Sequence, residues 1–133
     1  MFRFALPAAA LILAGAGASA PAGQRANPDQ ALIDKALRDF TAGAKVDCVR
    51  HEDVSEIRTF EDTILYERGR NTIWRNNTQG CKLGRDDLLV SKTLTPSRYC
   101  AGDIVQTHAR MGGQMTGSCT LGPFVTYTRT AQK

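Results

Sequence analysis

The chain has 133 residues, and 17 Lys and Arg against 13 Asp and Glu leave a formal net charge of +4 at pH 7. The charges of both signs are interspersed, whereas nucleic-acid-binding domains usually gather Lys and Arg on one surface with aromatic residues between them. We therefore expect no nucleic-acid partner.

Residues 1–20 have the pattern of a secretory signal peptide. Arg3 precedes an apolar run rich in Ala and Leu, and the segment ends in small residues around Ala18-Ser19-Ala20. The run is short for a membrane-spanning helix, which needs about 20 apolar residues, and no later stretch reaches that length. We expect a periplasmic or secreted protein with no stable membrane span after signal removal.

The rest of the chain has a length typical of one domain. Residues 21–26 are predicted to be a flexible lead-in, and 27–133 a single domain. Because a domain of this size buries only a modest fraction of its surface, covalent cross-links would stabilise it substantially.

A helix is predicted over about 28–41. Asn27 suits the N-cap position and Pro28 the first helical position. An apolar face at helical spacing is formed by Ile33, Ala36, Leu37 and Phe40. Gly43 is expected to end the helix.

Short β-rich runs bounded by turn residues follow the helix. The expected strands are 54–60, 63–68, 72–75, 88–95, 104–109, 115–120 and 124–129. The break at 68–71, Arg-Gly-Arg-Asn, predicts a hairpin turn. We therefore expect a mostly β fold: a small antiparallel barrel or sandwich of six or seven short strands with one N-terminal helix.

Four cysteines in an exported chain predict two disulfides. The four are Cys48, Cys81, Cys100 and Cys119. Three pairings are open, and we favour Cys81–Cys100 with Cys48–Cys119. The first would close a loop around strand 88–95, and the second would tie the start of the β region to its last hairpin. The cysteines are too widely spaced for a typical zinc site.

No catalytic, cofactor or metal-binding motif is recognisable, so we assign no catalytic or metal-ligating residue and expect no cofactor. His51 stands beside Glu52 and Asp53, and His108 lies near a strand end. Neighbouring residues of an extended chain point to opposite faces, so His51 and Glu52 are not expected to converge. A small hydrolase or metal-dependent enzyme using His51 and His108 is the alternative hypothesis.

Several segments resemble a family of small exported proteobacterial proteins classified only as a domain of unknown function. Besides Cys48, which opens the shared region, the matching segments are 62–66 (DTILY), 74–76 (WRN), 99–103 (YCAGD) and 118–124 (SCTLGPF). Around Cys81 the family has Cys-x-Gly-Leu, whereas this chain has Cys-Lys-Leu-Gly. The resemblance implies export and shared disulfides, and it implies no activity.

The polar residues of these segments are the candidate contact or register residues. They are Asp62, Arg75, Asn76 and Asp103, each at or near the end of an expected strand. Arg75 is expected either to pair with Asp62 or Asp103 and hold two turns in register, or to offer its guanidinium to an anionic partner. We expect a non-catalytic envelope module that binds a protein, a glycan or an anionic ligand.

Overall fold

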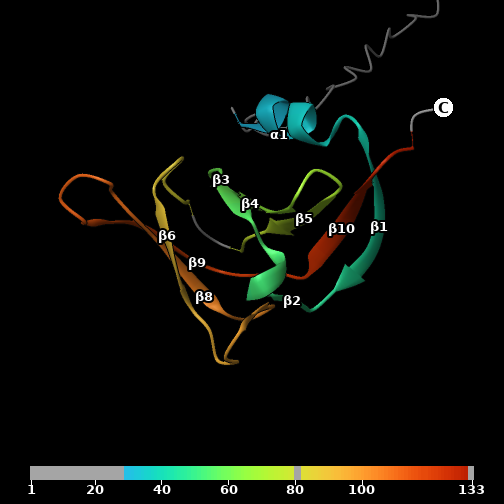
Figure 1. Ribbon diagram of the computed structural model, residues 1–133. Coiled ribbons are helices and arrows are strands. Elements are labelled where there is room, and N and C mark those ends of the chain that lie inside the picture. Colours follow the sequence, from blue (N-terminus) through green and yellow to red (C-terminus); the bar gives the residue numbers. More distant parts are fainter. Residues whose placement is uncertain (1–28, 80–81, 132–133) are drawn as a thin grey trace, which may run out of the picture.

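The computed structural model describes residues 29–79 and 82–131 (Figure 1). Several sequence-based expectations fall outside these ranges: the signal peptide at 1–20, the lead-in at 21–26, Asn27, Pro28 and Cys81. Within the described residues the chain forms one α-helix, one short 3-10 helix and ten strands. The fold is therefore mostly β with a single helix near its start, as expected.

Helix α1 (Gln30–Leu37) is shorter than the helix expected over 28–41. Its apolar face is confirmed, because Ile33 and Leu37 are both buried. The intervening polar side chains are exposed, as the helical period requires.

The segment expected to complete the helix forms strand β1 (Phe40–Val46) instead, paired antiparallel with β10 (Phe124–Arg129). Gly43 lies inside this strand and does not end a helix. A Cβ at Gly43 would lie 3.3 Å from the carbonyl oxygen of Thr126, so the two backbones approach closely there. Phe40 has the spacing of a helical residue, but its pairing with Arg129 of β10 outweighs that local preference.

The largest sheet is antiparallel, with strand order β1-β10-β5-β4-β3. Its other strands are β3 (Glu56–Thr59), β4 (Thr63–Arg68) and β5 (Thr72–Asn77). Strands β4 and β5 form the expected hairpin, and Gly69 in its turn has φ +55°. That backbone conformation favours glycine, which explains the turn signal in the sequence.

Two smaller antiparallel sheets complete the fold. One pairs β2 (Cys48–Arg50) with β7 (Arg98–Cys100), and the 3-10 helix (His51–Asp53) follows β2. The other has the order β6-β8-β9, formed by β6 (Leu88–Lys92), β8 (Ile104–His108) and β9 (Met115–Thr120). In Figure 1 this sheet lies to the left of the large sheet.

The described residues thus form ten strands in three open antiparallel sheets, more than the six or seven strands expected. The expected strands are confirmed, with some shifts at their ends. The additional ones are β1, β2 and β7. Strands β2 and β7 have three residues each, which is too short for alternation to be recognised in a sequence.

The large sheet packs on both of its faces. On one face, Phe60, Leu65 and Ile73 form an apolar cluster with Ile33 and Leu37 of helix α1. On the other face a second cluster contains Ile64, Tyr66, Phe124 and Val105, together with Val49, Leu83, Cys119 and Leu121. The large sheet is therefore the middle layer, and helix α1 covers one side of it (Figure 1).

The disulfide in the structure joins Cys48 to Cys100, which lie opposite each other in the β2–β7 ladder. Both favoured pairings are therefore wrong, because each used one of these two cysteines. The reason is register: β2 and β7 were not recognised as strands, so nothing in the sequence placed the two residues side by side. No cysteine within the described residues is a free thiol.

Candidate functional site

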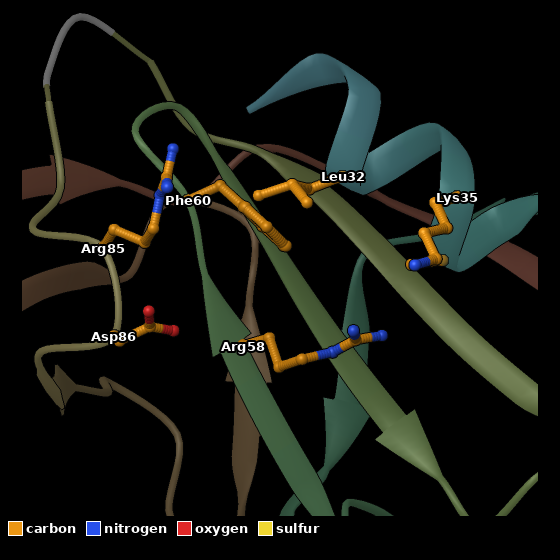
Figure 2. A pocket seen from close by; sticks show the side chains of 7 residues that line it. Leu32, Lys35, Arg58, Phe60, Arg85 and Asp86 are labelled. Carbon is orange, nitrogen blue, oxygen red and sulfur yellow. The ribbon is translucent and has the colours of Figure 1, made fainter. Parts of the chain in front are cut away.

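A pocket lies between helix α1, the end of β3 and the loop that precedes β6 (Figure 2). Its volume is about 430 Å³. The residues around it are Leu32, Lys35, Ala36, Arg58, Phe60, Arg85 and Asp86. Three of them are cationic and one is acidic, and the aromatic ring of Phe60 and the side chain of Leu32 supply an apolar wall.

Strand alternation explains why Arg58 and Phe60 face this pocket. Successive side chains of a strand point to opposite faces, so Arg58 and Phe60 share the side that faces helix α1. Ile57, between Glu56 and Arg58, packs instead into the cluster on the opposite face. In Figure 2 the side chains of Arg58 and Lys35 reach toward the same end of the pocket, and Asp86 lies on the other side.

The loop carrying Arg85 and Asp86 is held against the end of β3 by one backbone and one side-chain hydrogen bond. Leu83 N donates to Glu61 O at 2.7 Å, and Thr59 Oγ1 donates to Gly84 O at 3.2 Å. Asp86 has φ +59°, a conformation that non-glycine residues seldom adopt. Its carbonyl oxygen accepts a hydrogen bond from Arg110 Nε at 2.7 Å, which stabilises the turn.

Two of the three cations already contact an acid. Arg85 forms an ion pair with Asp29, a buried residue whose Oδ2 also accepts from Glu61 N at 3.0 Å. Arg58 forms an ion pair with Glu67. Lys35 has no ion pair with any described residue and is exposed. The pocket therefore combines an apolar wall with a positive charge that is not neutralised within the described chain.

The two histidines do not share a site. The ring of His51 lies against Tyr99 with centroids 4.0 Å apart, in a separate hollow with Arg50 and Arg98. His108 Nδ1 lies 3.0 Å from the carbonyl oxygen of Gly113, at the far end of β8. Among the described residues, no group of three or more His, Cys, Asp or Glu side chains is placed to hold a metal ion.

Tyr66 is buried beside Tyr99 and Phe124, in the same aromatic cluster as His51. Burial raises the pKa of the Tyr66 hydroxyl far above its usual range, with smaller contributions from Tyr99 and Asp103. A phenol with so high a pKa stays neutral, so Tyr66 serves packing and not proton transfer.

Asn76 and Asp103 are structural. Asn76 is fully buried and clamps Gly122, with Nδ2 donating to Gly122 O at 2.7 Å and Oδ1 accepting from Gly122 N at 3.0 Å. Asp103 is also buried, and its carboxylate accepts from Cys100 N at 2.8 Å and Leu94 N at 3.2 Å. The expected pairing of Arg75 with Asp103 is therefore wrong, because the Asp103 carboxylate closes its own turn.

Arg75 and Asp62 belong to one chain of side-chain hydrogen bonds. Arg75 Nε donates to Asn77 Oδ1 at 2.9 Å, and Thr63 Oγ1 lies 3.4 Å from the same oxygen. Thr63 Oγ1 also donates to Asp62 Oδ1 at 3.0 Å. Asn77 Oδ1 thus lies between Arg75 of β5 and Thr63 of β4, and the Thr63 hydroxyl bonds Asp62 in turn. Tyr66 and Trp74 lie opposite each other in the β4–β5 ladder.

The pocket residues were not among the candidates chosen from the sequence. Lys35 and Arg58 look like ordinary solvent-facing charges on a helix and a strand, and the Asp86-Asp87 pair looks like a turn. Their convergence depends on how helix α1 and the 82–87 loop pack on the large sheet, which no local pattern encodes.

Comparison of the chain with protein-family models, curated proteins and solved structures gave no match. Within the described ranges, no helix has the length and apolar character needed to cross a membrane.

Proposed function

We propose that this protein is an exported binding module for small organic anions that carry an apolar group, and that the pocket beneath helix α1 is its binding site. The observation that carries the proposal is the combination of the free Lys35 ammonium with the apolar surface of Leu32 and Phe60 around one cavity. The anionic group of the ligand would bind at Lys35 and Arg58, and its apolar group would lie against Phe60.

The physical chemistry of the pocket favours this class of ligand. Ligand sites typically combine apolar walls with a few polar groups that fix orientation. A carboxylate or phosphate is attracted by Lys35 and by the outer donors of Arg58, whose Nε is buried and has no hydrogen-bond partner among the described residues. Asp86 on the opposite side would repel a second anionic group there, so it favours one orientation of the ligand.

Export to the periplasm or the medium is part of the proposal. Its support is the signal-like segment at 1–20, the Cys48–Cys100 disulfide and the resemblance to a family of small exported proteins. A second disulfide, Cys81–Cys119, is proposed as well, because it is the pairing that remains once Cys48 and Cys100 are joined. Peptide mapping without reduction, on protein purified from the periplasm of a bacterial host, tests both points.

Calorimetric titration with a medium-chain carboxylate such as octanoate tests the binding site. Lys35→Gln is expected to weaken binding by about fivefold, because an exposed charge contact contributes up to about 1 kcal/mol. Leu32→Ser should weaken it through lost apolar contact. Both side chains are exposed, so neither change should unfold the domain.

Arg38→Gln is the matched control, since Arg38 is an exposed cation next to helix α1 that does not line the pocket. Octanoate affinity should be unchanged in this variant and should fall with added salt. Equal losses in Lys35→Gln and Arg38→Gln would indicate nonspecific attraction to the surface and would refute the assigned site.

A further inference from the structure

A second, smaller cavity lies next to the pocket beneath helix α1. The second cavity has a volume of about 190 Å³, and it shares Ala36 and Arg58 with the first. The two cavities therefore lie next to each other along the groove between helix α1 and the large sheet.

Arg129 lines the second cavity, and two contacts orient its side chain. Its Nε donates to the carbonyl oxygen of Arg70 at 2.7 Å, and its guanidinium carbon lies 4.8 Å from the centroid of the Phe40 ring. These two contacts leave the terminal nitrogens available. Neither Arg129 nor Arg70 forms an ion pair with an acid in the described part of the chain.

The charges along the groove are unevenly compensated. The two cavities together are lined by five cations (Lys35, Arg58, Arg70, Arg85 and Arg129) and two acids (Glu67 and Asp86). Arg58, which is paired with Glu67, lines both cavities, whereas Lys35 lines only the first and Arg129 only the second. Among the described residues, the first cavity thus has one cation without an ion pair, Lys35, and the second has two, Arg70 and Arg129, beside the apolar side chains of Phe40 and Ile73.

We propose that the natural ligand is an elongated dianion whose two anionic groups are separated by an apolar spacer, with one group bound at Lys35 and the other at Arg129. The proposal rests on the proposed function, since it extends the same site. A fixed guanidinium binds a carboxylate or phosphate through two parallel hydrogen bonds, and its fixed orientation reduces the entropic cost of binding.

The test compares α,ω-dicarboxylates of increasing chain length with monocarboxylates of the same length, by calorimetric titration. The dicarboxylate of one particular chain length should bind at least about fivefold more tightly than the monocarboxylate of that length. The contact of its second carboxylate with Arg129 forms within a ligand that is already bound. That gain should disappear in Arg129→Gln and diminish in Arg70→Gln, while monocarboxylate affinity stays the same.

Lys45→Gln, which removes an exposed cation of β1 that lines neither cavity, should leave the gain unchanged. Circular dichroism melting verifies that each variant is folded. If Arg129→Gln does not fold, Arg70→Gln still tests the second subsite. Equal affinities of both ligand types at every length would overturn the second subsite and leave the proposed function standing. Absence of binding by either type would overturn both.

Discussion

Replacing Asn76 with aspartate keeps the size and shape of a fully buried side chain but changes its hydrogen-bonding capacity. In the native protein, Asn76 Nδ2 donates to Gly122 O and Oδ1 accepts from Gly122 N, at 2.7 and 3.0 Å. In Asn76→Asp the donor becomes a carboxylate oxygen facing the Gly122 carbonyl. Gly122 is itself buried, so water cannot replace the lost donor.

We expect Asn76→Asp to lose about 3–5 kcal/mol of unfolding free energy at neutral pH, because it leaves an uncompensated buried charge. This is a large part of a typical total of about 5–15 kcal/mol. Burial and the adjacent carbonyl raise the pKa of the introduced carboxyl in the folded state above its unfolded value of about 3.9. Protonation of the introduced carboxyl restores an O–H donor to the Gly122 carbonyl. The variant should therefore regain its stability below the unfolded pKa and lose it as the pH rises through the folded pKa.

Urea unfolding followed by tryptophan fluorescence measures this loss, since Trp74 is the single tryptophan of the chain and packs against the core two residues from Asn76. Asn77→Asp is the control, because Asn77 is exposed and its side chain accepts from Arg75. The control should stay within about 0.5 kcal/mol of the native protein at all pH values. A loss in Asn76→Asp that is the same at acidic and neutral pH would refute the role assigned to the Asn76 amide.

Three further outcomes are expected. Cys48→Ser with Cys100→Ser should cost about 4 kcal/mol, because the bridge closes a sequence separation of 52 residues, and an unchanged urea midpoint would contradict that value. Tyr66→Phe should leave stability unchanged or raise it by up to about 1 kcal/mol, because the hydroxyl is buried without a hydrogen-bond partner among the described residues; a lower midpoint would show that it has one. Gly117→Ala should lower the melting temperature strongly, because the added Cβ would overlap a backbone carbonyl oxygen. Gly69→Ala, where nothing lies within 4 Å, should cost only the roughly 1 kcal/mol of its left-handed backbone, and an equal effect of the two alanines would count against the packing argument.

Elements formed by residues close together in the sequence were predicted accurately. Elements that depend on pairing with distant residues were not. Strands 63–68, 115–120 and 124–129 were predicted with their observed bounds, because each combines β-forming residues with adjacent turn residues. The expected helix extends to about residue 41 and so takes in the first two residues of β1, because Phe40 fits the helical spacing and its partner in β10, Arg129, lies more than eighty residues further along the chain.

The candidate site was predicted least well, for a related reason. Asn76 and Asp103 were chosen because polar residues at strand ends are conspicuous, and both bond to the backbone: Asn76 to Gly122 and Asp103 to its own turn. Lys35 and Arg58 are inconspicuous in the sequence, since exposed cations are common on helices and strands. Their importance arises only when the helix packs across the sheet and encloses the space between them.

The buried polar residues and the cations that line the pocket have different roles in this fold. Asn76 and Asp103 are buried and satisfy backbone donors and acceptors, so they stabilise the loops and are costly to replace. Asp29 belongs with them, because it is buried at the start of helix α1 and binds both the Glu61 amide and Arg85. The helix and the 82–87 loop are two walls of the pocket, and the Asp29 carboxylate connects them. The shape of the pocket is therefore set by buried groups, and its exposed cations can be substituted one at a time to change ligand preference without loss of the fold.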